Sequence, residues 1–174
     1  ENELIFYLEN SELSNNYKEE YEEVDPTIVS PIGFSYDSLY KFQGYQVFQL
    51  ADATVSSSEL DDVSKARLVW QSDVKDGVGK LVNHIFDEEI GFNVPQIMVD
   101  GADEGVSHSF SITKDYFATG DDRLVNNKEY HYLILAYAFN DYLAYEPGNE
   151  GQKYPYKAGR RNIKQYTAIP HDAS

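Results

Sequence analysis

The chain has 174 residues, and its 30 Asp and Glu residues against 14 Lys and Arg residues give a formal net charge of −16. This excess of negative charge argues against binding to nucleic acid or to an anionic membrane, because both partners require a basic surface. Hydrophobic residues make up 41% of the chain and aromatic residues 14%, which is too much apolar surface for an acidic disordered segment. We therefore expect residues 1–174 to fold as a single domain.

The chain contains no cysteine, which excludes disulfide bonds, thiolate metal sites and a cysteine nucleophile. No run approaches 18 consecutive apolar residues, so direct membrane insertion by a helix is not expected. The chain starts at Glu1, without the initiator Met or the basic segment that opens a secretory leader. We interpret it as a piece of a larger protein.

Taken in chain order, apolar, β-branched and aromatic runs predict strands at 4–8, 42–50, 67–71, 106–112, 129–140 and 162–169. Residues 106–112 alternate with a period of two, which is typical of a half-buried strand. Residues 129–140 are apolar on both faces near their end, which predicts a central strand. Because no helical period exceeds a turn or two, the pattern indicates an all-β sandwich.

Three long segments separate the predicted strands, at about 10–41, 72–105 and 141–161. The first is polar and carries Pro26 and Pro31, and the last is rich in Tyr, Gly and Pro. The repeated Gly residues of 72–105 indicate an insertion with one short strand.

The segment from Leu124 to Tyr130 resembles the fibronectin type III superfamily, in which a Leu six residues before a Tyr builds a tyrosine corner. The segment Phe42–Leu50, FQGYQVFQL, is similar to another strand of that fold, and both strands resemble fibronectin-like domains of large bacterial surface proteins exported by the type IX pathway. The resemblance implies an immunoglobulin or fibronectin type III-like β-sandwich with long loops at one pole and with Leu124 and Tyr130 as structural residues. The alternative is that Tyr130 is a plain core ring.

The chain departs from that family pattern at its first strand. No counterpart of the family's strand A precedes Leu4. The predicted strand 4–8 corresponds to strand B of the family and lacks the Trp that is usual there, while Trp70 lies elsewhere in the chain. A sandwich that begins this way leaves an edge of unpaired backbone groups. We expect a loop, a neighbouring domain or a strand from another chain to cover that edge.

Charge is distributed unevenly along the chain. Residues 1–25 carry nine acids and one base, whereas residues 153–164 carry five bases and no acid. Because the expected fold brings both segments to one pole, our hypothesis is that they lie against each other as an ordered cap. The alternative is two independent solvated loops.

The last long loop carries the candidate binding residues, which are Tyr142, Tyr145, Tyr154, Tyr156, Arg160 and Arg161. Tyr among Gly and Asn is typical of recognition loops, because the ring gives a large contact area at low entropic cost. The same composition also suits a loop that packs on its own domain.

Acidic clusters could supply the oxygen ligands of a Ca²⁺ ion, and the candidate cluster is Asp100, Asp103 and Glu104. No cluster follows the spacing of an EF-hand loop, and 30 acidic residues produce clusters by chance. The four His residues show no metal-binding spacing, and no GxSxG motif is present. We therefore expect no catalytic residues, and no cofactor except Ca²⁺.

These observations favour a non-enzymatic structural or interaction module of a secreted or cell-surface bacterial protein. Its expected partners are neighbouring domains of the same polypeptide or other cell-surface proteins. One alternative is a carbohydrate-binding module that stacks loop tyrosines on glycans, with or without Ca²⁺. Another is an accessory domain packed on a hydrolase.

Overall fold

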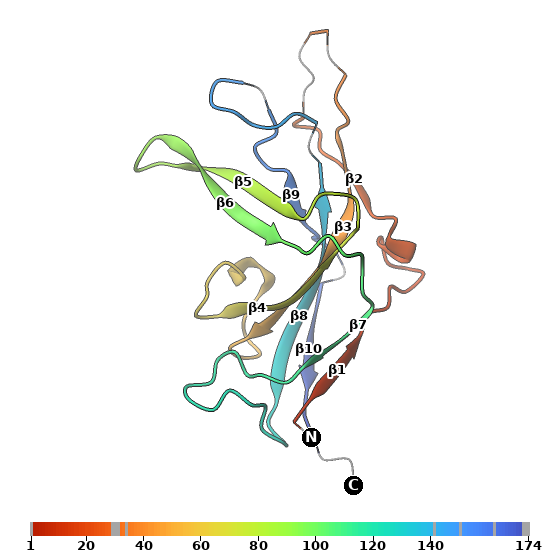
Figure 1. Ribbon diagram of the computed structural model, residues 1–174, viewed down its shortest axis with the longest axis vertical. Coiled ribbons are helices and arrows are strands. Elements are labelled where there is room, and N and C mark those ends of the chain that lie inside the picture. Colours follow the sequence, from red (N-terminus) through yellow and green to blue (C-terminus); the bar gives the residue numbers. More distant parts are fainter. Residues whose placement is uncertain are drawn as a thin grey trace.

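A computed structural model describes residues 2–28, 32–33, 35–140, 142–149, 151–161 and 163–171. Its secondary structure consists of β-strands and two short 3₁₀ helices, so the chain is all-β as expected (Figure 1). The elements are β1 (Leu4–Tyr7), η1 (Tyr17–Glu19), β2 (Glu22–Val24), β3 (Leu39–Leu50), η2 (Ser57–Glu59), β4 (Ala66–Asp73), β5 (Lys80–Asp87), β6 (Phe92–Asp100), β7 (Ser109–Ile112), β8 (Tyr130–Phe139), β9 (Tyr156–Ala158) and β10 (Lys164–Ala168). They form several antiparallel sheets, an arrangement consistent with a β-sandwich.

The centre of the fold is the long antiparallel pair of β3 and β8 (Figure 1). β2 and β4 pair with the other edge of β3 at its two ends, and β9 and β10 share the outer edge of β8 in the same way. The β3–β8 register shifts between Phe42 and Gly44. Gly44 is required at this bulge, because a Cβ there would lie 2.2 Å from the Ser72 carbonyl oxygen and 2.6 Å from the Tyr137 hydroxyl.

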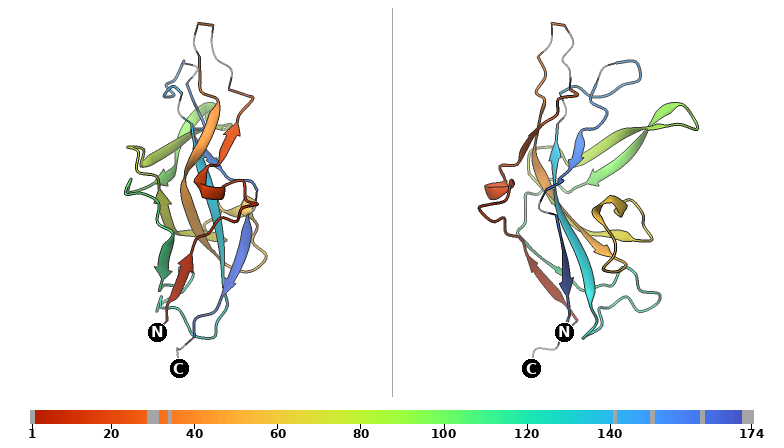
Figure 2. Two further views of the ribbon diagram at one scale, coloured as in Figure 1. Left: turned by 90° about the vertical axis from the view of Figure 1, so that its right-hand side faces the viewer. Right: turned by 180° about the vertical axis from the view of Figure 1, so that it is seen from behind.

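Each face of this central sheet is covered by a smaller pair of strands. On β8, Tyr130 and Tyr132 point to the face covered by β1 and β7. Leu133 and Leu135 point to the opposite face, which the β5–β6 hairpin covers with Leu81. The right-hand view in Figure 2 shows β1 and the hairpin on opposite sides of the central strands. Because both of its faces are buried, β8 is apolar on both faces.

Three stacked rings attach the β1–β7 pair to the central sheet. Phe110 of β7 lies with its ring centroid 5.0 Å from that of Phe6 and 4.1 Å from that of Trp70. Trp70 comes from β4, so the single Trp of the chain reaches this core from the central sheet. Such stacking adds to the burial energy of the rings.

Residues 124–130 close the base of β8. The hydroxyl of Tyr130 accepts a hydrogen bond of 2.8 Å from the backbone N–H of Val125. Leu124 and Tyr130 are both buried, at 0% and 2% exposed. The Nζ of Lys128 lies 4.8 Å above the centre of the Tyr130 ring and 2.8 Å from the carboxylate of Asp115. The segment is therefore held by buried side chains as well as by its backbone.

The interpretation of 72–105 as an insertion with one short strand is wrong, because β5 and β6 form a hairpin over most of it. Three of the glycines that suggested a loop, Gly79, Gly91 and Gly101, adjoin the ends of β5 or β6, and Gly91 takes a φ of 71° in the hairpin turn. Pro95 fits within β6 because that strand pairs only with β5 in the described part of the chain. The two other predicted loops contain β2 and β9.

The six predicted strands coincide with β1, β3, β4, β7, β8 and β10, with small shifts at their ends. The largest shifts are at β3, which begins at Leu39 instead of Phe42, and at β7, which begins at Ser109 instead of Val106. The predicted start of the last strand, Asn162, lies outside the described residues.

Candidate functional site

Four of the predicted binding residues, Tyr142, Tyr145, Tyr154 and Tyr156, belong to one end of the molecule, which carries β2, β9 and the segments 142–149 and 151–155 (Figure 1). We call it the loop end. The β5–β6 hairpin is bonded to it, because the N–H of His84 donates to the carbonyl oxygen of Lys153 at 2.7 Å. The Asn93 side chain likewise donates to the hydroxyl of Tyr145 at 2.8 Å. The loop end is thus built from three parts of the chain that are distant in sequence.

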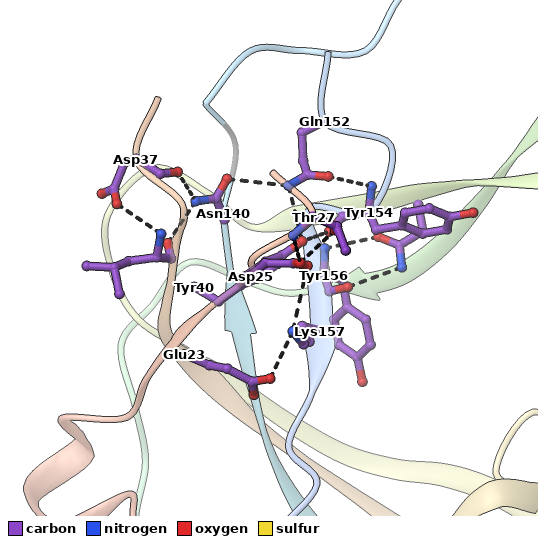
Figure 3. A network of polar contacts seen from close by, with 12 residues as sticks. Glu23, Asp25, Thr27, Asp37, Tyr40, Asn140, Gln152, Tyr154, Tyr156 and Lys157 are labelled. Carbon is purple, nitrogen blue, oxygen red and sulfur yellow. Dashed lines mark hydrogen bonds and ion pairs between the residues drawn. The ribbon is translucent and has the colours of Figure 1, made fainter. Parts of the chain in front are cut away.

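The acidic and basic segments meet at Lys157 of β9 (Figure 3). Its Nζ lies 2.9 Å from the carboxylate of Glu23 and 3.7 Å from that of Asp25. The Lys157 side chain is 15% exposed, so solvent screens these pairs less than it screens surface pairs. This contact supports the hypothesis of an ordered cap over the alternative of two solvated loops.

Both carboxyl groups are held in their ionised form. A hydrogen bond from the Tyr21 hydroxyl, followed by one from Lys157, lowers the pKa of Glu23. Burial raises the pKa of Asp25, but hydrogen bonds from Thr27 and the interaction with Lys157 together lower it by more than burial raises it. The pKa of Asp25 therefore lies below its ordinary value. Each carboxylate therefore contributes to stability at neutral pH.

Buried amide side chains bind the loop to the ends of β3 and β8 (Figure 3). The Gln152 side chain donates to the hydroxyl of Tyr40 at 3.1 Å and accepts from the N–H of Tyr154 at 3.0 Å. Tyr40 donates to the Tyr154 carbonyl oxygen at 2.6 Å, and burial raises its pKa to about 12. Asn140 donates to the carbonyl oxygen of Leu39 at 2.8 Å. Gln152 and Asn140 are not among the predicted site residues, because nothing in a sequence separates a buried amide from a solvated one.

The four loop tyrosines do not form one surface. Tyr142 stacks on Tyr36 with 4.1 Å between ring centroids, and Tyr145 packs 4.7 Å from the ring of His84. Tyr156 is 9% exposed and donates to the side chain of Gln46 at 2.8 Å, so it is a core residue and not a contact ring. Tyr154 is 46% exposed. The loop therefore packs largely on its own domain.

Arg160 and Arg161 are both exposed, and they border different hollows. Arg160 borders a hollow of about 670 Å³ at the loop end, which Tyr154 also lines. Arg161 borders a groove of about 330 Å³ between β1 and β10.

The predicted metal ligands do not converge. Asp100 and Glu104 are exposed, whereas the carboxylate of Asp103 accepts from the backbone N–H groups of Asp76 and Gly77 at 2.8 and 3.0 Å. Within the described ranges, no three His, Asp or Glu side chains are grouped as a metal site. Asp103 instead fastens the loop after β4 to the loop after β6.

Comparisons of this chain with models of protein families, with curated proteins and with solved structures give no match. In the part of the chain that the structure describes, no helix is long and apolar enough to cross a membrane. The geometry of the chain is therefore the basis for its functional assignment.

Proposed function

We propose that the chain is a non-enzymatic structural or interaction module of a secreted or cell-surface bacterial protein. The observation that carries this proposal is the contrast between the two ends of the fold. At the loop end, buried polar groups bond to one another, with Lys157 and Gln152 at the centre. In contrast, β1 pairs only with β7 among the described residues, and Ile5 and Tyr7 are 60% and 79% exposed. An unpaired strand edge with exposed apolar side chains is a surface for association.

We assign the module to the immunoglobulin or fibronectin type III-like sandwiches as part of this proposal. The pair β1–β7 would correspond to strands B and E, and the order β10-β8-β3-β4 would correspond to strands G, F, C and C′. The hydrogen bond between Val125 and Tyr130 at the start of β8 supports the same assignment. The β5–β6 hairpin is an addition to that pattern.

The proposed location can be tested on intact cells of the source organism. An antibody against this chain should label intact cells or the culture medium, and external protease should remove the cell-bound signal. A cytoplasmic protein serves as the control for cell integrity. A signal that appears only after lysis would contradict the proposed location.

A second candidate function, glycan binding at the loop end, is favoured by one observation, the exposed Tyr154 ring beside the hollow of about 670 Å³. Aromatic rings in such hollows stack on sugars. If this candidate holds, Tyr154→Ala should abolish binding on a glycan array. Tyr166→Ala is the matched control, because Tyr166 is also 46% exposed but lies on β10. Calorimetry that detects neither sugars nor Ca²⁺ would leave the structural or interaction role.

A further inference from the structure

One hydrogen bond at the end of β1 shows which edge of the strand the N–H and C=O groups of each residue face. The N–H of Leu8 donates to the carbonyl oxygen of His108 at 2.8 Å, in register with the β1–β7 ladder. Because alternate residues of an antiparallel ladder face the partner strand, Leu4 and Phe6 also face β7. The N–H and C=O groups of Ile5 and Tyr7 therefore point to the opposite edge, which pairs with no strand among the described residues.

At Tyr7, this unpaired edge borders the groove of about 330 Å³, whose other wall is β10. β10 pairs only with β8 in the described part of the chain, so the groove runs between the edges of two sheets. β1 and β10 lie side by side in Figures 1 and 2. Apolar side chains lining the groove include Phe6, Leu8, Ile134 and Ile163. Its volume lies in the range of ligand-binding pockets.

A second, independent feature of the groove is an unpartnered acceptor. Asn16 lines the groove near the Leu8 end of β1 and is only 4% exposed. Its amide group donates to the hydroxyl of Tyr45 at 3.1 Å, but its Oδ1 has no hydrogen-bond partner in the part of the chain that the structure describes. A buried acceptor without a donor is destabilising, and an incoming N–H group would satisfy it.

The charge at this end of the groove differs from that of the whole chain. Two basic residues, Arg161 and Lys164, and one acidic residue, Glu9, line the groove, and all three are exposed. Lys164 is the first residue of β10 and pairs with Ile134 of β8. In a chain of net charge −16, this basic rim attracts an acidic group.

We propose that the groove between β1 and β10 binds an extended strand of another polypeptide, which adds to the edge of β1 at Ile5 and Tyr7. The bound strand carries apolar side chains at alternate positions, an acidic residue beside Arg161 and Lys164, and an N–H donor for Asn16. This inference names the partner class of the proposed interaction module and rests on that role. Main-chain hydrogen bonds supply the affinity, and the groove selects the side chains.

The test uses the whole chain and fluorescent peptides of about eight residues, the length of an ordinary strand. The peptides alternate valine and threonine and carry a glutamate at the amino or the carboxyl end, because the strand direction is to be determined. A peptide with lysine in place of glutamate and a peptide with a central proline are the controls. We expect saturable anisotropy with a glutamate peptide and weaker binding of both controls.

Hydrogen exchange identifies the edge that is used. In the unbound chain, the amides of Ile5 and Tyr7 should exchange rapidly and that of Phe6 slowly. The glutamate peptide should protect Ile5 and Tyr7 and leave the protection of Phe6 unchanged. Protection elsewhere with none at β1 would overturn the proposal.

Two proline variants provide a matched comparison. Ile5→Pro removes an N–H that points to the unpaired edge of β1, and it leaves the β1–β7 bonds intact. We expect it to weaken peptide binding about tenfold, as the loss of a main-chain hydrogen bond does. Ser111→Pro is the control, because Ser111 stands opposite Ile5 in β7 and its N–H points away from the groove. Equal weakening by the two variants would overturn the proposal.

Charge reversal of Arg161 and Lys164 should weaken the glutamate peptide and strengthen the lysine peptide. If no peptide binds, the proposed occupant is wrong. It is also wrong if light scattering shows that the chain forms a dimer and hydrogen exchange places the dimer contact at β1. These outcomes are distinct from a failure of the proposed function, which the cell-surface experiment measures separately.

Discussion

Tyr130 and Tyr132 stand two positions apart on the same face of β8, but their hydroxyl groups have different environments. The Tyr130 hydroxyl accepts from the N–H of Val125, whereas the buried Tyr132 hydroxyl has no partner among the described residues. Burial also raises the pKa of Tyr132. At the residue scale, the same side chain therefore stabilises the fold in one position and carries an unsatisfied polar group in the other.

This difference predicts opposite results for two equal changes. Tyr130→Phe should lower the free energy of unfolding by about 1 kcal/mol, because the N–H of Val125 loses its acceptor. Tyr132→Phe should be neutral or slightly stabilising, because it removes an unpaired hydroxyl. Urea unfolding followed by the fluorescence of Trp70 measures both. A larger loss for Tyr132→Phe would contradict the assignment of the two hydroxyls.

Asp115 predicts a pH dependence of stability. Burial raises its pKa, but hydrogen bonds from Lys128, Gln49 and the N–H of Phe117 lower it more, so the folded pKa lies below the ordinary value of 3.8. As pH falls, the unfolded state binds the proton first, and the stabilisation is lost from about pH 4 downward through the folded pKa. Asp115→Asn should cost about 2 kcal/mol at neutral pH and flatten this acid-induced loss.

Urea midpoints at a series of pH values between neutrality and about pH 3 measure the effect of Asp115. Asp61→Asn, at an exposed position, is the control and should follow the pH profile of the unchanged chain. An unaltered acid slope in Asp115→Asn would show that other carboxylates govern the acid response.

At the scale of elements, the β5–β6 hairpin completes the core on one face of the central sheet. Leu81 of β5 is 2% exposed and Val99 of β6 is 2% exposed, and both belong to the cluster that contains Leu133 and Leu135 of β8. Without the hairpin, this face of the central sheet would be open to water. The hairpin is therefore part of the fold and not a decoration on it.

Leu81→Ala should lower the free energy of unfolding by about 3 kcal/mol, because it leaves a cavity in this core. Leu68→Ala is the matched control, because Leu68 of β4 is 42% exposed, and its truncation should cost about 0.5 kcal/mol or less. Thermal and urea unfolding measure both variants. Similar losses for the two would mean that the hairpin does not seal the core.

At the scale of the whole molecule, the net charge of −16 opposes compaction even though Lys157 is paired at the loop end. Raising NaCl from about 10 to 150 mM shortens the screening length from about 30 to 8 Å. We expect the melting temperature to rise by a few degrees, because repulsion among the acidic residues is screened. The same titration near the isoelectric pH is the control and should show a smaller rise. A fall in melting temperature with salt at neutral pH would mean that attractive pairs dominate.

The amino-acid sequence alone predicts the all-β class, the six main strands and the two segments of opposite charge. These features follow from local periodicity and composition, as the apolar run of β8 and the alternation before Ile112 illustrate. Its prediction for 72–105 was wrong because turn residues mark strand ends as readily as loops, and pairing partners are not local.

The accessibility of the candidate side chains depends on the tertiary structure. The tertiary structure places Tyr156 in the core and pairs Lys157 with the acidic segment. It also places Arg160 and Arg161 at separate hollows. It also brought Asn16 beside the unpaired edge of β1. Burial and hydrogen-bond partnership depend on contacts between residues distant in the chain, and no local pattern encodes them.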